Sequence, residues 1–137
     1  METQKIPLKE FLPGIAWFFI VATLTLMPGS DVPKVGWLDN IKNFDKFVHA
    51  VLFGGLTFLF MLPYFKSGFS FQHKRNYLIR ISLAAIVWGI TVEFIQRFYI
   101  PGRDFELLDW AADSLGVVIA FWICMKIIKK ENNKRVK

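Results

Sequence analysis

The 137-residue sequence contains only one cysteine and two histidines. A single cysteine cannot form a disulfide within the chain, and no cysteine–histidine spacing indicates a zinc site. Charged residues are also few, at 20% of the chain, and no motif or basic–aromatic pattern typical of nucleic-acid binding is present. These absences exclude a disulfide-stabilised domain, and we expect no nucleic-acid partner.

Apolar residues are abundant instead. They make up 54% of the chain, and the mean hydropathy of +0.39 is unusual for a soluble domain of this length. Four segments have about the 20 residues that a helix needs to cross the hydrocarbon core of a bilayer. We therefore predict an all-α, polytopic membrane protein, a single domain over residues 1–137, with helices at about 11–27, 47–65, 81–100 and 107–128 and a basic tail at 129–137.

The basic residues predict the orientation of these helices. Of the 17 lysines and arginines, 12 fall on the side shared by the two chain ends and by the connection between the second and third segments. By the positive-inside rule, both termini are expected in the cytoplasm. The first segment has the length of a cleaved signal peptide, but no pair of small residues suited to cleavage follows it, so we expect it to be retained.

Polar residues gather at the opposite, extracytoplasmic ends of the helices. Ionisable side chains are costly inside a bilayer and by default mark a functional site. Helical spacing places several of them on shared faces, four residues apart or in a stripe with small residues that allow helices to pack closely. These small residues include Gly89 in the third segment and Gly116 in the fourth. We predict one polar pocket near the outer leaflet, formed by Asp45, Lys46, His49, Glu93, Gln96, Arg103, Asp109 and Asp113.

The order of these polar residues resembles that of a known family. The motifs are Asp45-Lys46-x-x-His49, Glu93-x-x-Gln96, Pro101-Gly102-Arg103, Asp109 and Gly116. Together, over roughly residues 20–125, they resemble the pattern of VanZ-like membrane proteins. The resemblance implies a multi-pass protein of the bacterial plasma membrane that acts in the cell envelope, since the founding member is associated with resistance to the lipid-bearing glycopeptide teicoplanin.

Two positions depart from the family pattern. The family usually has Asn where this chain has Asp113, and a small hydroxyl residue where it has Glu106. Both changes add negative charge to the predicted pocket.

Several functions fit a pocket of this composition. The first is binding of a membrane lipid or a lipid-linked envelope compound, with Lys46 and Arg103 holding an anionic head group. The second is an intramembrane hydrolase or transferase acting on a lipid-linked phosphate or glycan. His49, Glu93 and Asp113 are the candidate catalytic residues, because they can exchange or orient protons.

Other interpretations of the same residues stay open. Oxygen ligands with one imidazole suit a divalent ion, but neighbouring cations can neutralise the acids, so we expect no metal and no cofactor. The polar cluster can also be a structural contact that fixes helix packing, with Asp45 and Asp109 at helix N-termini where acids are favoured. A transport path is disfavoured, because the cytoplasmic half of every helix is apolar and no repeat is evident.

Overall fold

The computed structural model describes residues 5–31, 36 and 41–136, which contain four long helices and no strand. The helices are α1 (Leu12–Leu26), α2 (Phe44–Lys66), α3 (Phe71–Tyr99) and α4 (Leu107–Val136), with short 3-10 helices at Leu8–Phe11 and Gly29–Asp31. Four spans, one in each long helix, are long and apolar enough to cross a membrane. The predicted all-α, four-helix architecture is confirmed, and it is that of a multi-pass membrane protein.

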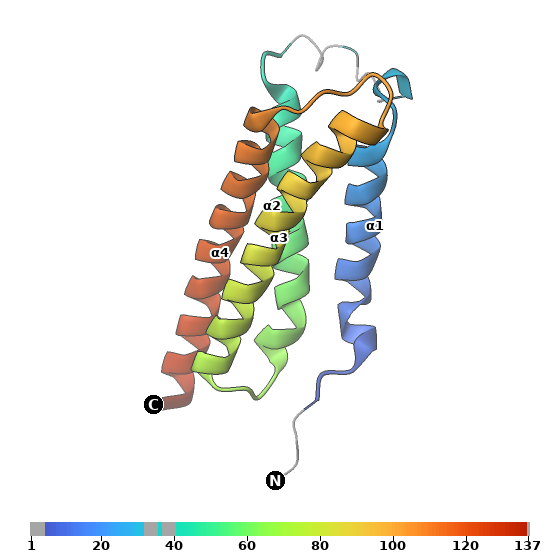
Figure 1. The fold of residues 1–137 in the computed structure, drawn as a ribbon. Coiled ribbons are helices and arrows are strands. Elements are labelled where there is room, and N and C mark those ends of the chain that lie inside the picture. The colour runs from blue at the N-terminus through green and yellow to red at the C-terminus, as the bar shows by residue number, and fades with distance from the viewer. Residues whose placement is uncertain (1–4, 32–35, 37–40, 137) are drawn as a thin grey trace.

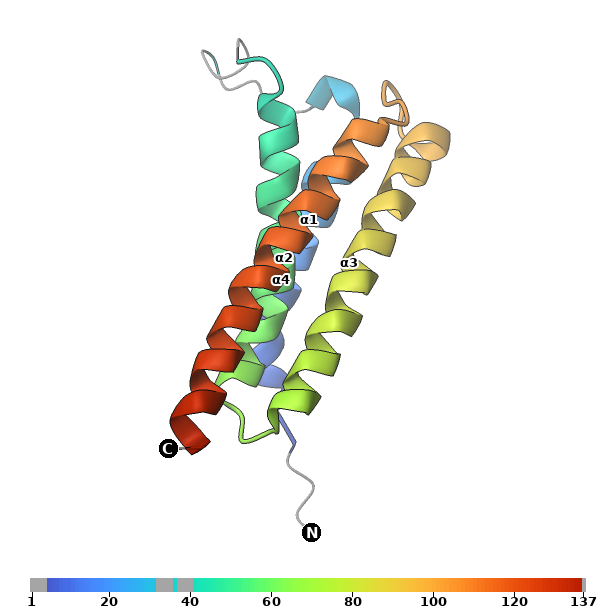
Figure 2. The same cartoon turned by 90° about the vertical axis from the view of Figure 1, so that its left-hand side faces the viewer.

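The four helices run alternately up and down beside one another (Figure 1). The start of α1 and the end of α4 lie at one end of the bundle, and the end of α1, the start of α2 and the α3–α4 connection lie at the other. Helices α2 and α4 make the closest contact, which can be followed in Figure 2. At Gly116 an added methyl group would overlap the backbone carbonyl of Ala50, and at Gly54 it would lie 2.9 Å from the Gly116 carbonyl oxygen. Glycine at these positions lets the two backbones touch.

The outer faces of the helices are as apolar as the core. The interior holds two clusters of buried side chains, one around Phe53 and Val117 and one around Met61 and Cys124. Large apolar side chains also cover the outside, and Val87 for instance is 61% exposed. Continuous exposed apolar surface is rare on soluble monomers, and it fits a bundle whose outer faces contact lipid.

Helix α3 begins earlier than predicted, at Phe71 instead of residue 81. The Ser70 hydroxyl accepts a hydrogen bond from the backbone N–H of His73 at 3.3 Å, which caps the new start. Lys74, predicted in a loop, is buried in this first part of the helix. Its amine donates to the Phe65 carbonyl at 3.0 Å and pairs with the Glu131 carboxylate at 3.2 Å. Hydropathy identifies only the part of a helix that lies inside the hydrocarbon core. The polar first turns of α3 are therefore not part of the span predicted from hydropathy.

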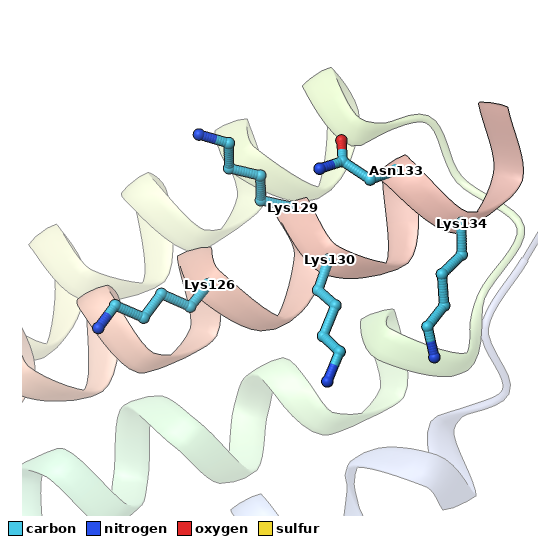
Figure 3. Close-up of a pocket in the computed structure, with 5 residues that line it drawn as sticks. All are labelled: Lys126, Lys129, Lys130, Asn133 and Lys134. Atoms are coloured by element: carbon cyan, nitrogen blue, oxygen red, sulfur yellow. The ribbon is translucent and has the colours of Figure 1, made fainter. Parts of the chain in front are cut away.

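The other boundaries shift less, except at the C-terminus. Helix α1 is preceded by a 3-10 turn, and α2 starts at Phe44. Helix α4 continues to Val136, so the segment 129–137 predicted as a tail is helical over its described residues. Figure 3 shows the basic side chains of this last part of α4, which line a surface hollow formed by Lys126, Lys129, Lys130, Asn133 and Lys134.

Candidate functional site

Lys46 is surrounded by three carboxylates at the end of the bundle opposite the termini. Its amine lies 2.6 Å from Asp45, 2.6 Å from Glu106 and 2.5 Å from Asp109. These acids come from the first turn of α2, the end of the α3–α4 connection and the first turn of α4. The lysine therefore ties the start of α2 to the start of α4.

His49 lies one turn deeper on α2 and contacts two aspartates of α4. Its Nδ1 lies 2.9 Å from Oδ1 of Asp113, and its Nε2 lies 3.8 Å from Oδ2 of Asp109. The imidazole is 8% exposed and Asp113 is fully buried. A carboxylate that accepts a hydrogen bond from one ring nitrogen fixes the orientation and tautomer of the imidazole. With Nδ1–H donating to Asp113, Nε2 is the ring nitrogen on the side of Asp109.

Glu93 reaches the same region from α3 and is fully buried. Its Oε2 accepts a hydrogen bond from the backbone N–H of Glu106 at 2.7 Å, at the residue just before α4. Its Oε1 has no hydrogen-bond partner among the described residues, and the same holds for Oδ2 of Asp113. A buried acceptor without a partner costs about 1–3 kcal/mol. The site therefore contains two buried carboxylate oxygens that the described residues leave unsatisfied.

Small residues allow these helices to bring their polar side chains together. The backbone contact between Gly116 and Ala50 lies one residue from His49 and three from Asp113, so it sets the distance across which this pair meets. On α3, a methyl group at Gly89 would lie 3.1 Å from Oδ2 of Asp113. Glycine at position 89 thus leaves space for the buried carboxylate, as the predicted stripe of small residues on α3 indicated.

Gln96 and Arg103 form a separate polar contact at the end of α1. Both donate to the backbone carbonyl of Thr25, Gln96 at 2.7 Å and Arg103 at 3.3 Å. This carbonyl is in the last turn of α1, where helical carbonyls lack an internal partner. Among the described residues, no hydrogen bond or ion pair links either side chain to the carboxylates around His49. The Nε of Arg103 is buried and has no hydrogen-bond partner within the described part of the chain.

The structure thus brings together six of the eight predicted site residues. The other two, Gln96 and Arg103, lie beside them at the end of α1. Asp45, Lys46, His49, Glu93, Asp109 and Asp113 form one cluster, which we call the polar cluster. Sequence reasoning missed Glu106 as a member, although it noted the acid there, because a residue in a connection has no helical phase from which its direction can be predicted. It also missed the Thr25 carbonyl, which no side-chain pattern can indicate.

The polar cluster has an excess of negative charge. Together with Glu106 it contains five carboxylates, and Lys46 is the one lysine or arginine paired with them in the described part of the chain. One ligand atom each from His49, Glu93 and Asp109 lies within 4.8 Å of the other two, close enough to share a metal ion. A second set, Asp45, Glu106 and Asp109, has the same property but is mostly exposed.

Comparison of the chain with models of protein families, with curated proteins and with solved structures finds no match.

Proposed function

We propose that this protein is a VanZ-like membrane protein of the bacterial cell envelope that binds the head group of a lipid-linked or lipid-like compound in its polar cluster, facing the outer leaflet. The observation that carries the proposal is the pair of unsatisfied, fully buried carboxylate oxygens of Glu93 and Asp113. Oxygens in this state are acceptors, so they fit a head group that brings hydroxyl or amine donors, such as a glycan.

The two cations of the site, Lys46 and Arg103, have different roles in binding the head group. Lys46 is engaged by three carboxylates, so its main effect is to neutralise them. Arg103 has a buried Nε–H without a described partner and is the better group for a phosphate oxygen. The proposed ligand therefore carries donors toward the carboxylates and an anionic group toward the end of α1.

An apolar crevice deeper in the bundle supports a ligand with a hydrocarbon chain. It has a volume of about 260 Å³ and lies between α1, α2 and α3, where its lining includes Phe18, Phe60, Ile81 and Trp88. Along α3, Trp88 and Ile81 are 5 and 12 residues from Glu93, or roughly 8–18 Å deeper at 1.5 Å per residue. An amphiphile with its head group in the polar cluster can place its chain in this crevice.

The His49–Asp113 contact favours a second function. An imidazole oriented by a carboxylate is the arrangement of a general base, and Nε2 of His49 is the nitrogen left to accept a proton. The alternative proposal is hydrolysis or transfer on a lipid-linked phosphate or glycan, with water activated by His49. The binding proposal is preferred over catalysis, because among the described residues no nucleophilic side chain contacts Nε2 of His49.

Native mass spectrometry of the full chain released from mild detergent tests the proposal. The wild-type protein is expected to keep an adduct of defined mass that is lost in Glu93→Gln and in His49→Ala. The matched control is Asp104→Asn, since Asp104 lies near the same end but is 79% exposed and pairs only with Arg97 among the described residues. Spectra without a defined adduct, or with an adduct equally retained in all variants, would contradict binding in the polar cluster.

A further inference from the structure

We infer that His49, Glu93 and Asp109 form a binding site for one divalent metal ion of the Mn²⁺ or Zn²⁺ type. One ligand atom of each residue lies within 4.8 Å of the others, and all three residues are buried. The inference concerns the ion itself and goes beyond the proposed function. An ion bound here takes the free oxygen of Glu93 and leaves Oδ2 of Asp113 for the donors of a head group.

The orientation of His49 is the first observation that points to a metal. Histidines that ligate metals almost always donate their other ring N–H to a carboxylate, carbonyl or water, which fixes the ring and strengthens the ligand. Asp113 holds Nδ1 of His49 in this way at 2.9 Å. The remaining nitrogen, Nε2, lies 3.8 Å from Oδ2 of Asp109. Two ligands that are each about 2.0–2.2 Å from one ion are separated by roughly 3–4 Å, so this distance fits a shared ion.

The unsatisfied oxygen of Glu93 is the second, independent observation. Oε2 is occupied by the backbone N–H of Glu106, whereas Oε1 is buried and has no partner among the described residues. Asp109 is arranged similarly, with Oδ1 at Lys46 and Oδ2 on the side of His49. Each of the three side chains thus uses one polar atom to hold its position and leaves another for a ligand bond.

The excess of negative charge in the surrounding cluster favours binding of a cation. Glu93, Asp109 and Asp113 are buried near one another, and Lys46 is shared with two further acids. A divalent ion neutralises two of these charges, and buried charges are stable only when they are paired or bind metal. Arg97, at the end of α3, pairs with the exposed Asp104 and not with these acids in the described contacts.

The donor set also selects the kind of ion. Carboxylate oxygens suit Mg²⁺, Ca²⁺ and Mn²⁺, whereas an imidazole nitrogen suits later transition metals such as Zn²⁺. One nitrogen with two carboxylates is a mixed set that Mn²⁺ and Zn²⁺ both accept. Zn²⁺ is expected to bind more tightly than Mn²⁺, following the general order of divalent-ion affinities.

Electron paramagnetic resonance of added Mn²⁺ tests the site. The full chain in lipid nanodiscs is stripped with a chelator and titrated with Mn²⁺ alone, and free Mn²⁺ is measured from its signal. The expected result is one bound Mn²⁺ per chain, displaced by Zn²⁺, with an electron-spin-echo modulation from a directly bound nitrogen. The nitrogen modulation distinguishes this site from the all-carboxylate set of Asp45, Glu106 and Asp109.

Variants assign the ligands in the same assay. Glu93→Gln and His49→Ala are expected to lose stoichiometric binding. Asp113→Asn should weaken binding about tenfold or more, as changes in the partners of metal ligands do. The matched control Asp104→Asn should bind as the wild type does. Glu93→Gln keeps the shape of the side chain, so this variant is expected to fold. Monodisperse elution and wild-type helicity verify that it does.

Two results would overturn the inference. One is the absence of stoichiometric Mn²⁺ and Zn²⁺ binding by the wild-type chain, which would mean that protons neutralise the buried carboxylates. The other is binding that lacks the nitrogen modulation or persists in a folded Glu93→Gln variant, which would place the ion outside the site of His49, Glu93 and Asp109.

Discussion

His49 and Asp113 depend on each other at the level of single residues. Both are buried, and their contact joins α2 to α4 through two residues that are 64 positions apart in the sequence. Loss of the carboxylate leaves a ring N–H without an acceptor, whereas an amide in its place still offers an oxygen. A neutral polar residue at position 113 should therefore destabilise the protein less than an apolar one.

We expect Asp113→Ala to destabilise the protein by about 1–3 kcal/mol, the cost of an unsatisfied buried polar group. Asp113→Asn should cost much less, because its side-chain oxygen can accept from Nδ1 of His49. Thermal unfolding in detergent measures both, with Asp104→Ala as the exposed control. Equal stability of the Ala and Asn variants would show that the contact with His49 contributes little to folding.

Residue spacing predicted part of this arrangement but not its pairings. The four-residue intervals between Asp45 and His49 and between Asp109 and Asp113 correctly indicated which side chains share a face. They could not indicate that His49 pairs with Asp113, because that depends on the rotation of α4 relative to α2. The sequence also could not indicate that Arg103 lies apart from the polar cluster. The position of Arg103 depends on the path of the α3–α4 connection past the end of α1.

At the level of helices, the contact of α2 with α4 determines the geometry of the site. It is set by backbone atoms at Gly116, Ala50 and Gly54. The sequence indicated Gly116 as part of a small-residue stripe, and hydropathy gave the centre of each helix. The start of α3 and the end of α4 were less predictable, because capping by Ser70 and the partly buried Lys74–Glu131 pair extend these helices beyond the apolar segments.

We expect Gly116→Ala to destabilise the bundle by about 1–3 kcal/mol, as overpacking of a close contact does. The added methyl group overlaps the Ala50 carbonyl, so the two backbones must separate. Unfolding in mixed detergent measures the effect. Leu115→Ala is the control, because Leu115 lies next to Gly116 but is 57% exposed on the outer face. A Gly116→Ala variant as stable as the control would contradict the proposed contact.

At the level of the whole molecule, the two ends of the bundle differ in charge. The end with the termini carries the lysines of α4, whereas the opposite end carries the polar cluster with its excess of acids. The positive-inside rule depends on the lysines and arginines alone, and by that rule the basic end is expected in the cytoplasm. The sequence predicted the asymmetry well, because charge counts do not require knowledge of helix contacts.

We expect a cysteine at position 104 to be labelled from outside intact cells and one at position 134 only after the membrane is permeabilised. Asp104→Cys and Lys134→Cys, each in a Cys124→Ala background, place single thiols at opposite ends of the bundle. A membrane-impermeant maleimide provides the measurement, and the Cys124→Ala chain without an added thiol is the control. Labelling of position 134 in intact cells would contradict cytoplasmic termini.

The crevice between α1, α2 and α3 has a consequence for how a compound would arrive. It lies roughly at mid-depth of the helices, and one of its lining residues, Ala84 on α3, is exposed at the outer surface of the bundle. A molecule with an acyl chain can therefore enter sideways by diffusing within the bilayer. The fraction of sites that hold the compound would then depend on the mole fraction of the compound in the bilayer. Even a compound scarcely soluble in water could therefore saturate the site.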